Sequence, residues 1–152
     1  MDACSALEMR EPAAATAPAR VRRWVQGRLA EWELADIGDD LALIASELVT
    51  NAIRCTVGRE IKVRLTREPG AVRLAVWDAS DGRPVRRRSA GGDDDPEAGT
   101  GGWGLPIVEA LSEKCGVTPT RPRGKWVWAR YAISGGAAVA AARPLVEVEP
   151  AV

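Results

Sequence analysis

Two alternating segments joined by a turn signal constrain the fold of this chain more than any other feature. Residues 61–66 alternate apolar and polar side chains, and residues 72–77 do the same. Glu68-Pro69-Gly70 lies between the two segments. Period-two alternation is typical of a half-buried strand, and a short connection with glycine favours an antiparallel hairpin. The middle of the chain is therefore predicted to form two paired strands.

The segments around this hairpin predict helices and further strands. Apolar residues recur at helical spacing over residues 18–32 and again over residues 39–53. A third helix is predicted over residues 105–114, a short strand near residues 116–120 and a last alternating strand over residues 125–133. This grouping, without alternating βαβ units, favours an α/β (α+β) two-layer sandwich. We expect a mixed, mainly antiparallel sheet with helices on one face.

Residue patterns at the two ends and before the third helix predict the domain limits. Residues 1–16 have no hydrophobic period, and residues 135–152 are rich in Ala, Gly and Pro. Both are predicted to be disordered tails, which leaves a single domain over residues 17–134. Residues 79–101 are irregular, and a connection of this length is usually either functional or disordered.

Composition excludes several classes of partner and compartment. The 152 residues include 21 basic and 21 acidic side chains, so the chain has no general attraction for nucleic acid or anionic membranes. No apolar run is long enough for a transmembrane helix, and the first residues lack the pattern of a signal peptide. Three widely spaced cysteines form no zinc pattern and suggest a reducing compartment. We therefore expect a cytoplasmic protein.

The chain contains no histidine. This excludes a Ser-His-Asp or Cys-His triad, a histidine-ligated metal and a phosphohistidine intermediate on this chain. Any chemistry must use carboxylates, amides, arginines and backbone donors.

Thr100–Ile107 places three glycines before the predicted third helix. Glycine allows the backbone to approach a ligand closely, and the first turn of a helix offers unpaired N–H groups and a partial positive charge. The combination suits phosphate, although a glycine-rich turn alone is weak support for a nucleotide site.

Two polar groups upstream are candidate ligand contacts. Glu47 and Asn51 lie one helical turn apart, bordering the apolar stripe of the second helix. Asp78 follows an apolar strand, where its carboxylate could lie at a sheet edge and accept from an amine such as that of adenine. Each has an ordinary alternative, because surface polar pairs are common and Asp is a frequent turn residue.

These residues belong to four motifs that follow one another in a characteristic order. They are Glu47–Arg54, Val76–Pro84, Gly102–Val108 and Gly124–Trp128. This order resembles the ATP-binding domain (GHKL type, Bergerat fold) shared by histidine kinases, gyrase-type ATPases and MutL. Within that superfamily the chain is most similar to the stand-alone serine/threonine kinases that act as anti-sigma factors in actinomycetes. The resemblance extends over about residues 18–133.

The resemblance implies a role for each matching residue. Glu47 would be the catalytic general base, Asn51 would ligate Mg²⁺, and Asp78 would accept from the adenine amine. Residues 83–101 would form a lid. The implied cofactor-binding residues are Asn51, Arg54, Asp78, Ser80, Gly82, Gly101, Gly102, Gly104 and Leu105. A site of this kind is chemically sufficient without histidine, because phosphoryl transfer depends on positioning and charge neutralisation.

The chain departs from the family pattern at three positions. Ser80 replaces a glycine, Cys55 stands where the helix usually carries a histidine, and Trp126 stands where the last strand usually offers a threonine near adenine. The role of Trp103, between two glycines, is not fixed by the sequence.

The function implied is that of an ATP- and Mg²⁺-dependent serine/threonine protein kinase of the anti-sigma factor type. Its expected partner is an anti-sigma factor antagonist of the STAS type, with a sigma factor as a further option. The alternative is a non-catalytic ATP-binding module for partner switching. A homodimer is compatible with the resemblance and with the tryptophans of the first predicted helix.

Overall fold

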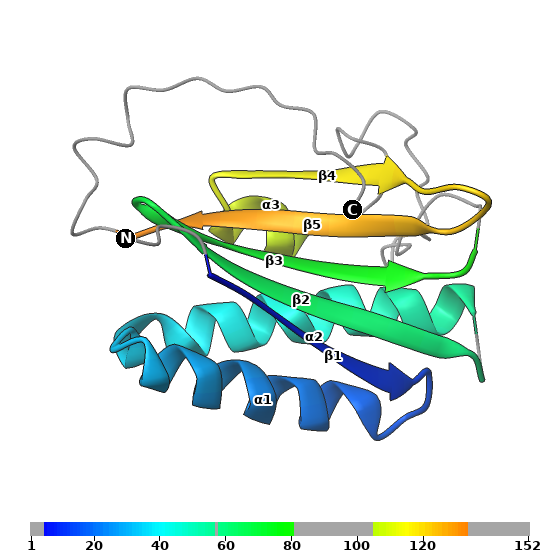
Figure 1. The fold of residues 1–152 in the computed structure, drawn as a ribbon, viewed down its shortest axis with the longest axis horizontal. Coiled ribbons are helices and arrows are strands. Elements are labelled where there is room, and N and C mark those ends of the chain that lie inside the picture. Colours follow the sequence, from blue (N-terminus) through cyan, green and yellow to red (C-terminus); the bar gives the residue numbers. More distant parts are fainter. Residues whose placement is uncertain (1–4, 57, 81–104, 134–152) are drawn as a thin grey trace, which may run out of the picture.

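A five-stranded sheet and three α-helices make up the described part of the chain (Figure 1). The computed structural model describes residues 5–56, 58–80 and 105–133. The elements are β1 (Ser5–Pro12), α1 (Ala17–Glu31), the 3₁₀ turn η1 (Ala35–Ile37), α2 (Gly38–Cys55), β2 (Glu60–Glu68), β3 (Ala71–Asp78), α3 (Pro106–Leu111), β4 (Lys114–Pro119) and β5 (Lys125–Ala132). The strand order is β1-β2-β3-β5-β4. No helix among these elements is long and apolar enough to cross a bilayer.

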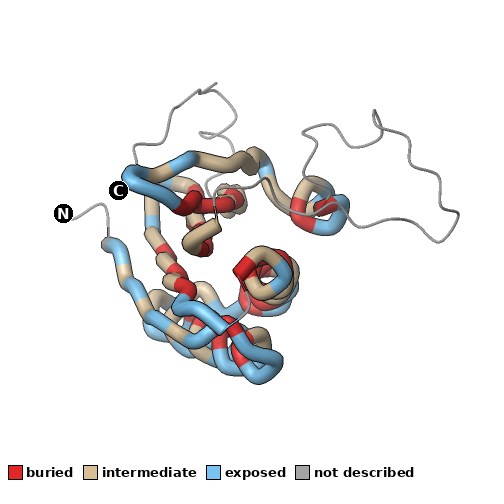
Figure 2. The backbone as a smooth tube through the Cα atoms, turned by 90° about the vertical axis from the view of Figure 1, so that its right-hand side faces the viewer, coloured by how far each residue is buried: buried red, intermediate tan, exposed pale blue. Residues whose placement is uncertain are grey.

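The helices cover one face of the sheet, and the core lies between the two layers (Figure 2). Val21, Val25 and Leu29 of α1 are fully buried, and they recur at the spacing of one helical face. The strands contribute alternate residues to the same core, as Val63 and Leu65 of β2 do. The predicted α+β sandwich with helices on one face is therefore confirmed.

The sheet formed by the described strands is antiparallel throughout, so the expected mixed character is corrected. β4 and β5 form a hairpin, and β5 lies between β4 and β3 with its direction opposite to both. The third helix is also shorter than predicted. The backbone is extended at Ser112, and the Glu113 N–H donates to the Arg130 carbonyl, so the chain joins the sheet immediately after α3.

The predicted tail over residues 1–16 is wrong for Ser5–Pro12, which forms β1 on the edge of the sheet. Leu7 and Met9 are half-buried on the side of the core, whereas Glu8 and Arg10 are exposed. Two apolar residues among charged ones give only a weak period-two signal. Charged residues are nevertheless typical of an edge strand, where they oppose pairing with another sheet.

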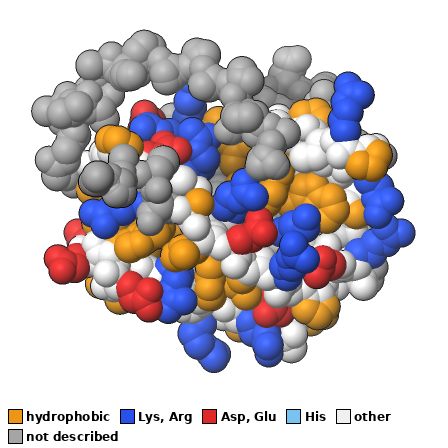
Figure 3. All heavy atoms as spheres, viewed as in Figure 1, with side chains coloured by type: hydrophobic (Ala, Val, Ile, Leu, Met, Phe, Trp, Pro, Cys, Tyr) orange, Lys and Arg blue, Asp and Glu red, His pale blue; other side chains and the backbone are white. Residues whose placement is uncertain are grey.

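The sheet face opposite the helices, here called the open face, is built from tryptophans covered by cations. The Lys62 ammonium, the Arg64 guanidinium and the Arg73 guanidinium lie 4.7, 4.6 and 4.8 Å from the ring centres of Trp77, Trp126 and Trp128, respectively. Figure 3 shows hydrophobic side chains between Lys and Arg side chains on this face. Cation–π contacts of this kind favour the observed arrangement of alternating rings and cations.

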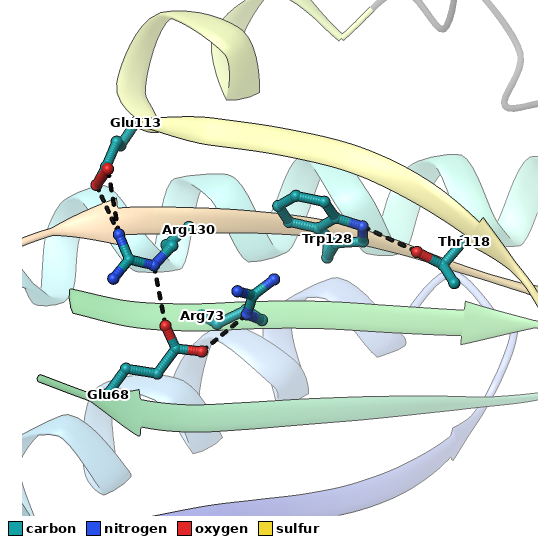
Figure 4. A network of polar contacts seen from close by, with 6 residues as sticks. All are labelled: Glu68, Arg73, Glu113, Thr118, Trp128 and Arg130. Atoms are coloured by element: carbon teal, nitrogen blue, oxygen red, sulfur yellow. Dashed lines mark hydrogen bonds and ion pairs between the residues drawn. The ribbon is translucent and has the colours of Figure 1, made fainter. Parts of the chain in front are cut away.

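A carboxylate–guanidinium network joins β2, β3 and β5 to Glu113, the residue before β4, across the open face (Figure 4). Glu68 accepts from Arg73 and Arg130, both at 2.9 Å, and Arg130 also contacts Glu113 at 2.9 Å. Burial alone would raise the pKa of Glu68, but the hydrogen bonds and charges of the two arginines outweigh it and lower that pKa. The network therefore keeps Glu68 ionised.

The tryptophans of α1 do not form an exposed surface. Trp24 and Trp32 are half-buried and pack against the core, and the Arg67 guanidinium lies 6.0 Å from the ring centre of Trp32. They therefore give no support to a homodimer through this helix.

Tyr131 provides a spectroscopic test of the contact between sheet and helix. Its hydroxyl donates to Asp40 at 2.7 Å, and burial together with the Asp40 charge raises the pKa of Tyr131 to about 12. Because the folded-state pKa is raised, the contribution of this contact to folding stability is complete below the unfolded pKa of about 10. That contribution is lost as the pH rises toward 12. Because Tyr131 is the only tyrosine in the chain, phenolate absorbance reports it alone.

The expected titration midpoint is about 12 for the native protein. Asp40→Asn is expected to lower it, since the variant removes the negative charge and keeps an acceptor. A midpoint at the ordinary tyrosine value in the folded native protein would show that this contact is not formed.

Candidate functional site

Asp78 is the last residue of β3 and lies at the end of the central strand, not at a sheet edge as the sequence suggested. Its side chain shares the helix-facing side of the strand with Val76 and Leu74, and it is 0% exposed. An aspartate in such a place requires partners, because burying an unpaired charge is costly.

A buried ion pair with Lys125 supplies the principal partner. The two residues lie opposite each other on β3 and β5, and the Lys125 ammonium is 2.9 Å from Asp78 Oδ1. The backbone N–H of Ser80 donates to the same oxygen at 2.8 Å. Within the described residues, Asp78 Oδ2 is buried without a hydrogen-bond partner. One carboxylate oxygen is thus held by the protein, and the other remains an available acceptor.

The environment of Asp78 acts on its charge in two opposing ways. Burial raises the pKa of the carboxyl above its ordinary value, while the hydrogen bond and charge of Lys125 and the Ser80 N–H partly offset that increase. Lys125 is therefore the main group that favours the ionised, accepting form of Asp78.

The turn between β4 and β5 fixes the position of Lys125. Gly124 has φ +93°, and a Cβ there would lie 2.5 Å from Cζ2 of the Trp77 indole. The Trp77 indole N–H donates to Thr120 Oγ1 at 3.0 Å, and this hydroxyl in turn donates to the Arg123 carbonyl at 2.6 Å. Glycine at position 124 thus allows Trp77 to close over the turn, which places the next residue, Lys125, opposite Asp78.

Trp126 lies on the sheet face opposite the one from which the Asp78 carboxylate projects. Successive residues of a strand point to opposite faces, so Lys125 faces the helices and Trp126 lies on the open face beneath Arg64. The residue that stands beside Asp78 on the last strand is Lys125.

Three further sequence-predicted residues lie on α2, with Glu47 at its middle and Asn51 and Arg54 toward its C-terminal end. Asn51 is buried, at 2% exposed, Glu47 is half-buried one turn earlier, and Arg54 is exposed. Within the described residues, Glu47 has no hydrogen-bond or ion-pair partner. Figure 1 shows that the C-terminal ends of α2 and β3 and the start of β5 lie at the same end of the molecule. The candidate Mg²⁺ ligand Asn51 and the Asp78–Lys125 pair therefore lie toward this end, and the candidate base Glu47 lies one helical turn before Asn51.

The remaining predicted site residues divide into two groups. Ser80 donates its backbone N–H to Asp78, and Leu105 packs into the core immediately before α3. The predicted lid over residues 83–101, Trp103 and the glycines at the phosphates lie outside the described residues. These glycines are Gly82, Gly101, Gly102 and Gly104.

Lys125 is the site residue that sequence reasoning missed. The alternation of the last strand contained the signal, because Lys125 falls on the same side as the core residues Val127 and Ala129. A lysine at a core-facing position is unusual and indicates a buried partner.

Comparison with known proteins assigns the chain to a family. A family model for the histidine kinase-like ATPase domain matches residues 11–131, and the chain belongs to this family. Among solved structures it is similar to the RsbU and RsbW domains of Rv1364c from Mycobacterium tuberculosis, with a TM-score of 0.54 and 24% identity. That match covers 84% of this chain and 32% of the other, so the chain spans about a third of that protein. A search of curated proteins gave no match.

Membership of this family implies ATP binding, and the described residues fit that ligand. Asp78 Oδ2 is a buried acceptor that could take the hydrogen of an exocyclic amine. Among the described residues, no group of three or more His, Cys, Asp or Glu side chains is arranged to hold a metal ion. In proteins Mg²⁺ is usually bound through few protein ligands together with substrate phosphates and water.

Gly124→Ala is expected to destabilise the protein, because the new methyl group would meet the Trp77 ring at a residue with positive φ. The expected loss of unfolding free energy is about 1–3 kcal/mol, measured by urea denaturation. Gly27 in α1 is the matched control, since nothing lies within 4 Å of a Cβ there. Gly27→Ala should stabilise the helix by roughly 0.5–1 kcal/mol. Equal effects of the two substitutions would contradict this account of the turn.

Removing one member of the Asp78–Lys125 pair should cost more than removing both. Asp78→Val leaves a buried ammonium without its carboxylate, and the expected cost is about 3–5 kcal/mol. The double variant Asp78→Val/Lys125→Met should recover a large part of that stability. A double-mutant cycle by chemical denaturation measures the coupling, and additive losses would show that the two groups do not interact.

Proposed function

We propose that this protein is an ATP- and Mg²⁺-dependent serine/threonine protein kinase of the anti-sigma factor type. The observation that carries the proposal is the buried acceptor, Asp78 Oδ2, at the end of the central strand. Family membership supports ATP as the ligand. The amine of adenine is the natural donor for a carboxylate oxygen that is buried without another partner.

Asn51 and Glu47 are proposed to serve the phosphate end of the ligand from α2. Asn51 would hold Mg²⁺ through its amide oxygen, and the ion when bound would neutralise phosphate charge. Arg54 lies three residues after Asn51, and it offers an exposed guanidinium near the same end of the helix. These three groups provide charge neutralisation and positioning, which are the main requirements of phosphoryl transfer.

Glu47 is proposed as the general base. Its carboxylate is half-buried and has no partner within the described residues, so it is available to accept the proton of an incoming hydroxyl. As the hydroxyl oxygen bonds to the transferred phosphorus, its proton passes to Glu47 and ADP leaves. The phosphoacceptor would be a serine or threonine of an anti-sigma factor antagonist, the partner that the family resemblance implies.

Glu47→Gln tests the assignment. It is expected to lower phosphate transfer from labelled ATP to the cognate antagonist by roughly 10²–10⁴-fold, because the amide cannot accept the proton. ATP affinity, measured by titration calorimetry, should remain unchanged. Glu60→Gln is the control, since Glu60 is exposed at the start of β2 and should affect neither measurement.

Three outcomes would revise the proposal in different ways. Transfer that survives in Glu47→Gln removes the base role from this residue. ATP binding without transfer to any antagonist captured from the native organism favours a non-catalytic ATP-dependent binding module. Failure to bind ATP at millimolar concentration contradicts the proposed function as a whole.

A further inference from the structure

The Lys125 ammonium has more hydrogen-bond donors than the described residues use. Its side chain is 4% exposed, and its hydrogen-bond partner within the described residues is Asp78 Oδ1. A lysine ammonium carries three N–H donors, so two of them have no acceptor in this part of the chain. A buried ammonium is costly where its donors lack acceptors, and a ligand acceptor would lower that cost.

Stability alone does not account for the ion pair. β3 and β5 are already joined by seven other residue pairs, from Ala71–Ala132 to Trp77–Trp126. Well-packed apolar residues often replace a buried ion pair without loss of stability. The position of the pair, at the end of the molecule toward which Asn51 lies, instead indicates contact with a ligand.

The pair presents one acceptor and one donor from neighbouring strands. Asp78 Oδ2 accepts, and the Lys125 ammonium donates. Adenine offers the complementary arrangement, because its exocyclic amine donates and a ring nitrogen beside that amine accepts. The pair is also neutral as a unit, so contact with an uncharged base leaves no net charge buried.

We infer that Lys125 is a second base-contacting residue. Its ammonium donates to the ring nitrogen beside the exocyclic amine, and that amine donates to Asp78 Oδ2. This inference rests on the proposed ATP binding. It makes base recognition depend on two side chains, with Lys125 both holding Asp78 Oδ1 and touching the base. The resulting specificity is for a base that carries an amine next to an unprotonated ring nitrogen.

Nucleotides that lack single atoms test this assignment on the native chain. The affinities of ATP, purine riboside triphosphate, 1-deaza-ATP and 7-deaza-ATP are compared by titration calorimetry. Loss of the amine should weaken binding through Asp78, and loss of the contacted ring nitrogen, N1 or N7, should weaken it about tenfold, the size of one buried hydrogen bond to a charged donor. Equal affinities for ATP and both deaza analogues would overturn the role of Lys125.

Lys125→Met then assigns the lost contact to this side chain. The variant keeps an unbranched stem and is expected to bind ATP about tenfold more weakly, with the deaza penalty abolished. Lys114→Met is the matched control. Lys114 lies opposite Arg130 in the register of β4 and β5, near the other end of β5, so this substitution should change neither quantity. Circular dichroism checks that both variants fold, and the analogue series on the native chain decides if Lys125→Met does not.

The outcomes separate this inference from the proposed function. No ATP binding by the native chain contradicts the proposed function. ATP binding that Lys125→Met leaves unchanged or strengthens overturns the inference alone, since Lys125 would then be neutral or would compete with the base for Asp78.

Discussion

The buried Asp78–Lys125 ion pair is the contact on which the candidate site depends. It joins the central strand β3 to its neighbour β5 at the end of the molecule where α2 ends, and it determines which oxygen of the carboxylate remains available. Burying both charges is costly, and apolar residues could join the strands equally well. The pair therefore makes most sense as part of a ligand site, with Ser80 and Lys125 holding one oxygen so that the other can accept.

The two faces of the sheet divide structural and ligand-binding tasks between alternate residues. On the open face, Trp77 packs over Gly124, and its indole N–H donates a hydrogen bond to Thr120. These contacts fix the turn before β5. On the helix-facing side, the next residues along, Asp78 and Lys125, meet in the pair. The tryptophans and cations of the open face thus lie on the side of the sheet opposite the Asp78 carboxylate. A substitution on the open face can consequently affect the site through the position of the turn.

Sequence patterns predicted the fold where their period was strong and failed where it was short. The hairpin of β2 and β3 followed from alternation, and the helices followed from apolar spacing. β1 was missed because Leu7 and Met9 alone carry its period among charged residues. The places of Glu47 and Asn51 on α2 could be predicted, since helical spacing fixes them locally. The partnership of Asp78 with Lys125 could not, because strand register joins residues far apart in the sequence. The roles of the glycines near residue 102 stay predictions.

A crystal structure with a non-hydrolysable ATP analogue and Mg²⁺ tests the central claim most directly. The exocyclic amine of adenine is expected to lie within hydrogen-bond distance of Asp78 Oδ2, while the Lys125 ammonium stays on Oδ1 and reaches a ring nitrogen. A base bound away from the end of β3, or a Lys125 side chain displaced from Asp78 by the nucleotide, would contradict it.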